Sequence, residues 1–544
     1  MTGSRSSQSA SGDGARARQA DGDVRISAID IGSNSIRQII ADVSPTGAIR
    51  VVDEMKAAPR LGAGIQQTGE LNRAAIDAAM AALGRMEALS TQLGARRTRV
   101  VATSAVREAS NAAEFLGRVK LETGLDVVVL DGEDEARLSF RSAQAHFDLG
   151  SGRAAVIDIG GGSLELALSA EGLVERLISL PFGAIRLTER YFSRGITPRA
   201  MRKLRRAVRR GLREEFSARD WRGAQVIGSG GTFTNLAGIV LARQGMRTAK
   251  TVHGTIVQRV ELEHVVDYLA ALSPAERQTV PGLNVARADI IVAGLAAVAE
   301  VLARLEAKSF AVSSYGIREG ILLELARVKP RSADRGEARE RSVRELAQRS
   351  HFEEPHARQV QKLAVRLFDS IGEKLGCHPE ERQTLSDAAL LHDIGYHINY
   401  DKHHKHSCHL ISHAELLGMT PAEQIVIANV ARYHRGAEPR RSHGNFGPLN
   451  AADRARVRRL AAILRVADGL DRGHTAAVAD IRVRWLDRAL RLIPVPAEGA
   501  SIRLELWGAS KKSGLLSKIA GVPVEIVMPG GETYQAERDE TKPD

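Results

Sequence analysis

Aromatic residues and cysteines are scarce in this chain of 544 residues. Phenylalanine, tryptophan and tyrosine together make up 4% of it, which argues against base stacking as the main mode of ligand recognition. The two cysteines, Cys377 and Cys408, are too few for a disulfide framework, and no Cys-x-x-Cys pair indicates a zinc site. So few cysteines are typical of a reducing compartment, and we expect the protein in the cytoplasm.

Long hydrophobic segments are missing as well. The longest apolar run, residues 290–299, stops at Glu300 and is too short to cross a bilayer. Residues 1–24 are polar and rich in Gly, Ser and Arg, without the apolar stretch of a secretory signal. We expect these first residues to form a flexible tail and the protein to have no membrane partner.

Positive charge is in excess. The chain has 77 Lys and Arg residues against 65 Asp and Glu residues, a net charge of +12. Such an excess favours anionic partners such as phosphate polymers or nucleic acid, although a solvated basic surface alone would also produce it. At roughly 150 residues per domain, the length predicts three to four domains.

An internal repeat gives the organisation of the first half. The segment "IDIGSNSIRQIIADV" at 29–43 aligns without a gap to "IDIGGGSLELALSAE" at 157–171, and Asp30 corresponds to Asp158. Each copy reads as strand, turn and strand, so the repeat predicts two α/β lobes with a cleft between them. A third glycine turn, "VIGSGGTFTNLAG" at 226–238, follows a strand and opens a helix.

The second half differs in composition. A charged, Pro-containing stretch near 329–345 reads as a linker or an exposed helix start, and 346–480 look all-helical. After 481, "SIRLELWG" and "PVEIVMPG" read as short strands. We therefore expect five parts, which are a tail at 1–24, a first lobe at 25–150, a second lobe at 151–328 whose last helix returns to the first, a helical domain at 340–480 and a small α+β module at 481–544.

The glycine turns point to phosphate chemistry. A strand–Asp–x–Gly–x–x–Ser turn exposes backbone amides and a hydroxyl, and glycine lets an oxyanion approach them closely. One such turn is weak evidence, but two matched turns and a third favour a phosphate site. No GxxxxGK[ST] and no strand–GxGxxG–helix occurs, which excludes a P-loop NTPase and disfavours a dinucleotide fold.

Carboxylates follow these turns. Asp30 and Asp158 end strands, and Glu165 lies seven positions after Asp158, where such groups could hold Mg²⁺. Equally, Asp158 could simply cap its turn. The acids of "DGEDEAR" at 131–137 open a helix and could orient a water for attack on phosphorus, or only compensate the helix dipole.

Basic residues occur in two informative places. Arg107 follows a strand, where it could make a bidentate phosphate contact or remain a surface arginine. The segment "RAMRKLRRAVRRGLR" at 199–213 places arginines at helical spacing. It could form a track for a polyanion, and a solvated helix face is an equally good interpretation.

Histidines and acids gather in the helical half. His356, the dyad His392–Asp393 and Asp468 form an H…HD…D arrangement that could hold a divalent metal such as Mn²⁺ and activate water on a phosphate ester. His403, His404 and His406 in "HHKHS" could add contacts to metal or phosphate. The alternative is a helical domain that only packs or dimerises.

Together these motifs resemble a known family. Seven segments are similar, in the same order, to motifs of the exopolyphosphatase / guanosine pentaphosphate phosphohydrolase family. They are "AIDIGSNSIRQIIADV", "VATSAVREASNAAEF", "LDGEDEARLSF", "VIDIGGGSLELAL", "LPFGAIRLTERYF", "VIGSGGTFTNLAG" and "SSYGIREGILLE". Residues 346–480, with "HDIG", "HHKHS", "ARYHR" and "ILRVADGLDR", resemble the HD-type helical domain of its longer members.

The resemblance implies a fold and an activity. It implies a two-lobed actin-like (ribonuclease-H-like) α/β fold and Mg²⁺-dependent release of the terminal phosphate from inorganic polyphosphate, or of the 5′ γ-phosphate from pppGpp. Glu135 is implied as the base, although Asp134-Glu135 stands where the family usually has Glu-Glu, and Asp158 and Glu165 are implied in metal binding and catalysis. The implied phosphate-binding residues are Gly32, Ser33, Asn34, Ser35, Arg107, Gly160, Gly161, Gly162, Ser163, Gly228, Ser229, Gly230 and Gly231.

Three other functions stay open. A phosphatase specific for pppGpp would use the same residues. A kinase of the same fold would need an acceptor site, for which no signature is visible. A regulator that only binds phosphate chains is disfavoured by intact Glu135, Asp158 and Glu165. We expect inorganic polyphosphate as the partner, no specific nucleic acid, and a homodimer.

Overall fold

The computed structural model describes residues 23–45, 47–246, 251–328, 335–399, 401–414 and 416–528. The expected tail therefore lies outside the described residues except for its last two, and Val24 already begins the first strand. The chain divides into two compact units. Unit 1 comprises residues 1–142 and 317–330, and unit 2 comprises residues 143–316 and 331–544.

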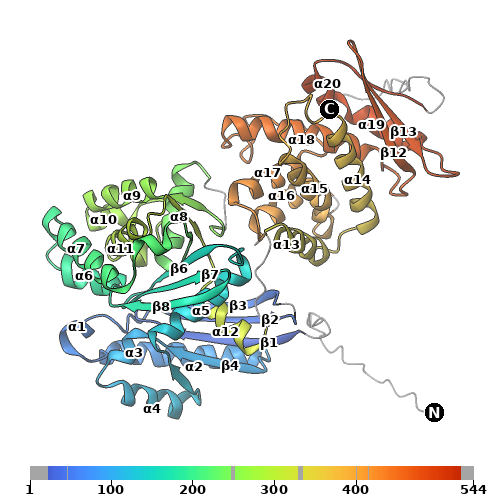
Figure 1. Ribbon diagram of the computed structural model, residues 1–544. Helices are drawn as coiled ribbons and strands as arrows, with labels where there is room; N and C mark the ends of the chain where they lie inside the picture. The colour runs from blue at the N-terminus through green and yellow to red at the C-terminus, as the bar shows by residue number, and fades with distance from the viewer. Residues whose placement is uncertain are drawn as a thin grey trace, which may run out of the picture. The chain divides into compact units, whose positions relative to one another are not determined.

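Unit 1 contains a five-stranded sheet in the order β3-β2-β1-β4-β5 (Figure 1). β1 pairs antiparallel with β2 and parallel with β4, so the carboxyl ends of β1 and β4 lie at one edge. The strands are β1 (Val24–Ile31), β2 (Ile36–Val43), β3 (Ile49–Ala57), β4 (Arg97–Ala102) and β5 (Val127–Val129).

Helices flank the unit 1 sheet. The apolar stripe of α2, with Leu83 and Met86, packs against Ile29 and Ile31 of β1, as expected from its helical spacing. The chain returns to unit 1 in α12, which packs against β1, and Gly320 approaches the backbone of Leu138. The helices are α1 (Ile65–Thr68), α2 (Arg73–Gln92), α3 (Ser104–Glu108), α4 (Ala112–Thr123), α5 (Gly132–His146) and α12 (Ile317–Leu325).

Unit 2 opens with a six-stranded sheet in the order β10-β11-β9-β6-β7-β8. β6 pairs antiparallel with β7 and parallel with β9, which repeats the relation of β1 to β2 and β4. The sequence repeat is therefore a structural repeat. The strands are β6 (Arg153–Ile159), β7 (Leu164–Ala170), β8 (Leu173–Leu180), β9 (Gln225–Ser229), β10 (Ile256–Gln258) and β11 (Ser309–Val312).

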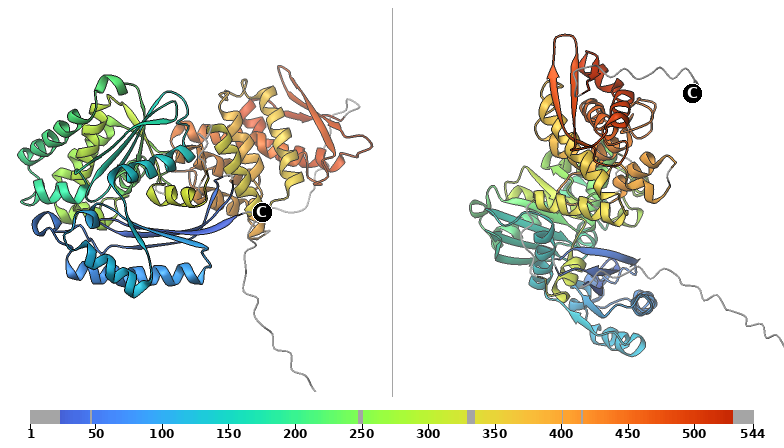
Figure 2. Two further views of the ribbon diagram at one scale, coloured as in Figure 1. Left: turned by 60° about the horizontal axis from the view of Figure 1, so that its bottom comes forward. Right: turned by 90° about the vertical axis from the view of Figure 1, so that its right-hand side faces the viewer.

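Four helices of this part of unit 2, α6, α7, α8 and α9, contact α11, which carries the longest apolar run of the sequence. They are drawn in shades of green in Figure 2. Residues 291–302 of α11 are all buried, so this run forms the centre of a core. In the described part of the chain, no helix is both long and apolar enough to cross a bilayer. The helices are α6 (Ala184–Phe192), α7 (Pro198–Glu215), α8 (Gly231–Arg243), α9 (Arg259–Ala271), α10 (Pro274–Gln278) and α11 (Ile291–Arg304).

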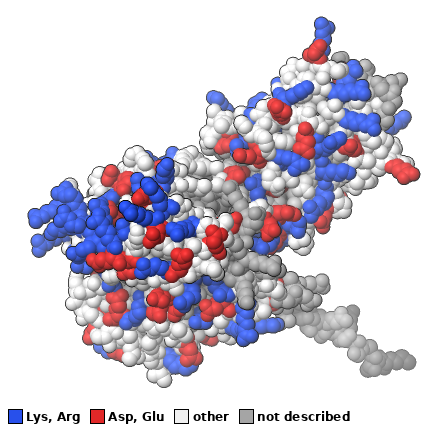
Figure 3. Space-filling model, in the orientation of Figure 1, with Lys and Arg blue, Asp and Glu red and all other residues white. Residues whose placement is uncertain are grey.

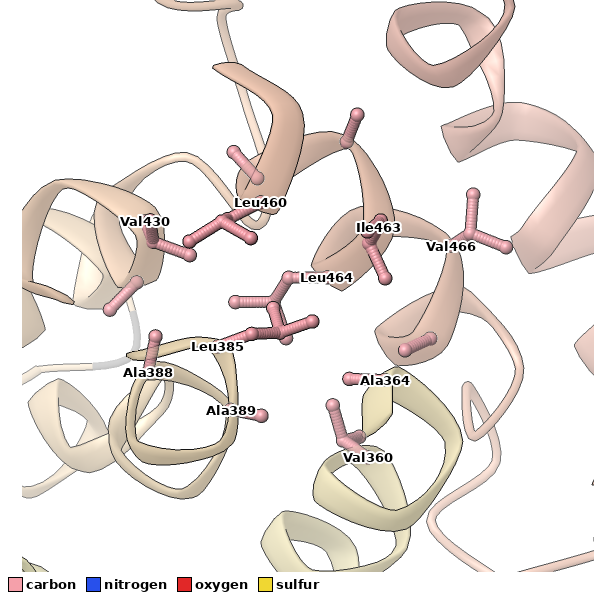
Figure 4. Packing of buried hydrophobic residues seen from close by; sticks show 14 of the residues in the cluster. Val360, Ala364, Leu385, Ala388, Ala389, Val430, Leu460, Ile463, Leu464 and Val466 are labelled. Carbon is pink, nitrogen blue, oxygen red and sulfur yellow. The ribbon is translucent and has the colours of Figure 1, made fainter. Parts of the chain in front are cut away.

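The helical region of unit 2 has its own core. Figure 4 shows buried aliphatic side chains of α14, α15, α17 and α18 converging, among them Val360, Leu385 and Leu464. The helices are α13 (Arg335–Arg349), α14 (Glu354–Ile371), α15 (Glu381–Leu391), α16 (His403–His413), α17 (Pro421–Arg432) and α18 (Ala451–Gly469).

The last described elements share that core. A three-stranded sheet, β12 (Val478–Trp485), β13 (Leu490–Pro496) and β14 (Val524–Ile526), is joined by α19 (Arg503–Lys512) and α20 (Gly514–Ala520). The interpretation of "SIRLELWG" as a strand was wrong, because these residues begin α19. Their apolar residues alternate locally, but Ile502, Leu506 and Ala509 are buried with the three- and four-residue spacing of a helix.

Candidate active site and metal centre

The first glycine turn, residues 32–35, joins β1 to β2. The Gly32 amide donates to the Ser35 carbonyl at 3.1 Å, and the Gly62 amide donates to the Ser33 carbonyl at 2.8 Å. A Cβ on Gly62 would lie 2.7 Å from the Ser33 side chain, so only glycine at this position lets the two backbone segments pack this closely. Ser33, Asn34 and Ser35 are buried, and among the described residues the amides of Ser33 and Asn34 donate to no other backbone carbonyl.

The second glycine turn, residues 160–163, has the same internal bond, because the Gly160 amide donates to the Ser163 carbonyl at 3.0 Å. The start of α6 holds this turn from one side. The amides of Ala184 and Ile185 donate to the carbonyls of Gly160 and Gly161, at 2.9 Å each. In a trans peptide the carbonyl and the following amide point in opposite directions. The amides of Gly161 and Gly162 are therefore turned away from α6, an arrangement in which neighbouring amides can bind an anion.

The third glycine turn leads from β9 into α8. Gly230 has a φ of +87°, which glycine adopts without strain, and Gly231 begins the 13-residue helix. A Cβ on Gly231 would lie 2.1 Å from the Arg287 guanidinium, so a buried cation lies at the helix N-terminus. This concentration of positive charge favours an anion. Gly228 also allows close packing, since a Cβ on it would lie 2.2 Å from the Phe233 ring.

Two buried carboxylates flank the second turn, and one of them, Asp158, also approaches Gly230 of the third. Asp158 ends β6 and is paired across the sheet with Glu165 of β7, so both side chains lie on one face. The Ser229 hydroxyl donates to Asp158 Oδ2 at 2.9 Å, and the Ser179 hydroxyl donates to Glu165 Oε1 at 3.1 Å. The two residues are 8% and 2% exposed. Their oxygens fit the ligand preference of Mg²⁺, which keeps several waters in such sites.

In unit 1, Glu135 and Arg107 are brought together, which the sequence did not indicate. Arg107, on the short helix α3, donates from Nη1 to Glu135 Oε1 at 2.5 Å and to the Leu130 carbonyl at 2.6 Å. In the structure Arg107 holds the buried carboxylate, and its expected contact with phosphate stays a prediction. Asp134 is exposed and paired with Arg137. The burial of Glu135, which is 3% exposed, therefore supports Glu135 over Asp134 as the base.

The basic segment 199–213 lies on α7. Arg205 and Arg209 bind Glu300, and Arg205 also binds Glu263, so two of its arginines are used within unit 2. The remaining basic residues are exposed, and Figure 3 shows a dense group of Lys and Arg side chains over this helix. The exposed residues are Arg199, Arg202, Lys203, Arg206, Arg210 and Arg213.

The four residues expected to bind a second metal lie close together. The Nε2 atoms of His356 and His392 are 3.6 and 3.5 Å from Asp393 Oδ2. The same nitrogens are 3.8 and 3.9 Å from Asp468 Oδ1. His356, His392 and Asp393 form one of two groups among the described residues that could hold a metal ion.

Burial controls the protonation of these groups. It lowers the pKa of His392, and the neighbouring carboxylates only partly oppose it, so the imidazole is neutral near pH 7. Burial by itself would raise the pKa of Asp393, but His392, His403 and His434 hold that pKa well below its usual value. The neutral imidazole of His392 and the ionised carboxylate of Asp393 are the forms that bind metals. For His356, burial is outweighed by Asp471, Asp468 and Asp393, which raise the pKa of this imidazole.

The other metal group contains a residue that sequence reasoning missed. It consists of Asp393, His403 and His434. His434 stands in the "ARYHR" motif, which indicated the resemblance but was assigned no role. Of the three histidines expected in "HHKHS", His404 and His406 belong to neither group. Arg287 was missed too, and nothing in its local sequence signals a site.

Comparisons with known proteins agree with this geometry. Residues 39–328 match the model of the Ppx/GppA phosphatase family, and residues 338–492 match that of "Ppx/GppA phosphatase, domain III". A protein of Photobacterium profundum, named guanosine-5'-triphosphate,3'-diphosphate pyrophosphatase, is 30% identical over 438 residues, covering 80% of this chain and 84% of its own.

Solved structures cover the first part of the chain. An exopolyphosphatase from Cytophaga hutchinsonii is 27% identical and covers 57% of this chain and 100% of its own, with a TM-score of 0.51. A Ppx/GppA family member from Aquifex aeolicus is 29% identical and covers 56% of this chain and 97% of its own, with a TM-score of 0.48.

Proposed function

Because this chain belongs to the Ppx/GppA phosphatase family, we propose that it hydrolyses the terminal phosphoanhydride bond of a phosphate chain, with inorganic polyphosphate as the principal substrate. The observation that supports this proposal most directly is in unit 2. There the amides of Gly161 and Gly162 are turned to one side of their loop, and the carboxylate of Asp158, which is paired with Glu165 on one face of the sheet, lies close to Gly230 before α8.

Each group has a role in this proposal. The glycine-turn amides bind the oxygens of the terminal phosphoryl group and stabilise the charge of the transition state. Glu135 takes a proton from water, whose oxygen bonds to the terminal phosphorus while the bridging P–O bond breaks and the shortened chain leaves. Arg107 keeps the Glu135 carboxylate in place. Asp158 and Glu165 would hold Mg²⁺, which would supply positive charge to neutralise the phosphates.

The surface of α7 favours a long polyanion. Besides Arg209, which binds Glu300, six of its basic residues are exposed, and α7 packs against α6, whose first residues hold the second glycine turn. A polyphosphate chain carries charge along its whole length and can use such a surface, whereas a single nucleotide cannot. The second candidate substrate is pppGpp, which is favoured by the name of the Photobacterium profundum relative.

The test compares the two substrates. The purified full-length protein is assayed with Mg²⁺ on long-chain polyphosphate and on pppGpp, and kcat/KM is measured for each at two salt concentrations. We expect the higher kcat/KM for polyphosphate, with a KM that rises steeply with salt because several phosphates are bound. A higher kcat/KM for pppGpp would select the second candidate, and no hydrolysis of either would overturn the proposal.

A further inference from the structure

A pocket of about 540 Å³ lies in the helical region of unit 2, between α13, α14 and α15, which are labelled in Figure 1. Each helix presents one face to it, because the lining residues recur every three or four positions, as Arg358, Lys362 and Val365 do in α14. The pocket shares no residue with the site proposed for hydrolysis or with the histidine cluster around Asp393. It is therefore a separate feature of the fold.

Positive charge predominates among the side chains that line this pocket. Five of them are cationic and two are carboxylates, and none of the described residues that line it is aromatic. The cations are Arg339, Arg344, Arg358, Lys362 and Arg382. The pocket therefore attracts an anion and offers no ring on which a nucleotide base could stack.

Arg339 is buried at this pocket, and its guanidinium is only partly satisfied. The residue is 8% exposed. Its Nε donates to Asp387 Oδ2 at 2.6 Å, and its Nη1 donates to Glu423 Oε1 at 3.4 Å. Its third nitrogen, Nη2, is buried and has no hydrogen-bond partner among the described residues. A buried donor without an acceptor costs free energy, and an anion in the pocket would supply the acceptor.

Asp387, which also lines the pocket, does not cancel this attraction. It is 2% exposed, and both of its carboxylate oxygens are occupied. Oδ2 accepts from Arg339, and Oδ1 accepts from the Gln383 side-chain amide at 2.8 Å. A buried carboxylate that is paired with a cation in this way holds the guanidinium in a fixed orientation. The charge that faces a ligand is then set by the other four cations.

These four cations are free to change partners. Three of them form ion pairs in which both side chains are at least 41% exposed, and such pairs contribute little to stability. The fourth, Lys362, donates to the Ala479 carbonyl at 2.8 Å and forms no salt bridge within the described part of the chain. The three pairs are Arg344–Glu340, Arg358–Glu354 and Arg382–Asp369. Four long side chains from three helices could therefore turn toward one ligand at little cost.

A solvated cluster of ion pairs is the competing explanation. A water molecule could satisfy Nη2 of Arg339, and exposed arginines pair with neighbouring acids without any ligand. This explanation predicts no affinity for an anion beyond the effect of net charge. A built site predicts an affinity that depends on the lining residues and not on other cations of the same helices, so the two explanations are testable.

We propose that this pocket binds a compact anion with at least two phosphoryl groups, of which inorganic pyrophosphate is the simplest. Arg339 holds one phosphoryl group with its fixed guanidinium. Arg344, Arg358, Lys362 and Arg382 close around the other. The site is separate from the proposed hydrolysis and binds its ligand without reaction.

The class of ligand follows from charge and lining. A single phosphate group carries about two negative charges at pH 7, which leaves several of the five cations without a partner. A nucleoside would find no aromatic ring among the described lining residues. A long polyphosphate is disfavoured as well, because Glu354 and Asp369 are exposed beside two of the cations and would repel a chain that continued past the pocket.

Such a ligand would connect α13 to its neighbours. In the structure, α13 is tied to α15 by Arg339 and Asp387, and the Ser342 hydroxyl accepts from the Leu417 amide at 3.1 Å. An anion that contacts α13, α14 and α15 together adds links between all three helices. Local opening of α13 should therefore become rarer when the site is occupied.

Binding is tested on the full-length protein in magnesium-free buffer. Calorimetry measures the affinity for pyrophosphate, and hydrogen–deuterium exchange followed by mass spectrometry locates the ligand. We expect slower amide exchange in α13 and a higher Tm in the presence of pyrophosphate. Unchanged exchange in α13 at millimolar pyrophosphate would overturn the site. Because no turnover is measured, this outcome is independent of whether the protein hydrolyses polyphosphate.

A pair of double variants separates the pocket from general electrostatics. Arg344→Gln/Lys362→Gln removes one lining cation from α13 and one from α14, and should weaken pyrophosphate binding at this site by about 10-fold or more. The matched control, Arg349→Gln/Arg366→Gln, removes one exposed cation outside the pocket from each of the same helices, and should keep the affinity within about 3-fold. Equal effects of the two double variants would overturn the built site.

Arg339→Lys tests the buried guanidinium. The lysine keeps a positive charge beside Asp387 but cannot present a fork of donors. We expect an unchanged circular dichroism spectrum and an affinity for pyrophosphate that is about 10-fold lower. An unchanged affinity in a folded Arg339→Lys variant would remove the guanidinium from the site and contradict the proposal.

A comparison of ligands tests the need for two phosphoryl groups. Pyrophosphate should bind to this site at least about 10-fold more tightly than orthophosphate or AMP, which have one phosphoryl group each. The difference should disappear in Arg344→Gln/Lys362→Gln. Equal affinities for orthophosphate and pyrophosphate would show a site for a single phosphate, and tighter binding of AMP would show a nucleotide site. Either result would overturn the assignment.

Discussion

At the scale of single residues, the proposed base is defined by its environment more than by its position in the sequence. Asp134 and Glu135 are neighbours at the start of α5, and Asp131 Oδ1 accepts from the Asp134 amide at 2.8 Å. Only Glu135 is turned inward and held by Arg107. A buried carboxylate with a fixed position can orient water, whereas an exposed one in an ion pair cannot.

Glu135→Gln should keep polyphosphate binding but lower kcat by about 10²- to 10⁴-fold, because the amide cannot accept the proton of the attacking water. Asp134→Asn is the matched control and should keep kcat within about 3-fold, since Asp134 is exposed. Steady-state kinetics with Mg²⁺ measures both. A wild-type kcat in Glu135→Gln would remove Glu135 from the mechanism.

His253 should make the stability of unit 2 depend on pH. Burial and the nearby His146 lower its pKa to about 3, and its ring packs against Tyr315 with centroids 4.9 Å apart. In the unfolded chain the pKa is about 6.5, so below pH 6.5 the unfolded state binds one more proton than the folded state. The free energy of unfolding should therefore fall as the pH falls from 6.5 toward 3, by about 1.4 kcal/mol per pH unit.

Denaturant unfolding between pH 7.5 and 5 tests this dependence in wild type, His253→Asn and the exposed control His264→Asn. Since the asparagine does not titrate, the His253→Asn variant should lose less stability on acidification than wild type. The His264→Asn control should follow wild type. If the free energy of unfolding depends on pH equally in wild type and His253→Asn, the pKa of His253 is not lowered in the folded state.

At the scale of elements, α7 divides its arginines between two tasks. Arg205 and Arg209 are tied to Glu300, a buried residue of α11, and so fix the helix to its neighbour. The exposed residues are left for solvent or for an anion. This division explains how one helix can be both a packed element and a basic surface.

Replacing Arg202, Arg206 and Arg210 together by Gln should raise the KM for long polyphosphate by at least about 3-fold and leave the KM for a short chain unchanged, because only a long chain reaches the helix surface. The matched control replaces the exposed Arg73, Arg85 and Arg96 of unit 1, which changes the net charge equally. Equal effects of the two triple variants would indicate a general electrostatic effect without a track on α7.

At the scale of the whole molecule, the chain combines the two-lobed actin-like α/β fold of its family with a helical domain III. The helical region and the C-terminal sheet share one hydrophobic core, so a cut within them would expose it. The junction after Val328 is different. Val328 is buried in unit 1, where Arg141 binds its carbonyl, and the next described helix begins at residue 335.

A protein ending at Val328 should therefore fold and hydrolyse short polyphosphate. It should also lose affinity for long chains, because we expect the basic and histidine-rich helical region to extend substrate binding. Circular dichroism establishes folding, and KM against chain length gives the answer. Complete loss of short-chain hydrolysis in a folded truncated protein would place part of the catalytic machinery after Val328. An unchanged KM for long chains would remove the helical region from substrate binding.

Features that depend on local pattern could be predicted from the order of the residues alone. The repeated strand–turn–strand segments, the helical spacing of 72–93 and 199–213 and the helix opened by "DGEDEAR" all appear in the structure. Glycines and alternating apolar residues restrict the backbone locally, so they can be read in order along the chain. The same local reading failed for 501–508, because burial against α18 selected a helix over a strand.

Which side chains meet could not be predicted in this way, because it depends on the packing of the folded chain. Arg107 and Glu135 are 28 residues apart, and nothing in the spacing predicts their ion pair. Arg287 reaches the start of α8, and His434 faces Asp393, through the packing of separate elements. Such contacts depend on how strands and helices pack against one another. That packing is determined jointly by residues that are distant in the chain. A motif can therefore name candidate ligands, and the fold alone arranges them into two sets around Asp393.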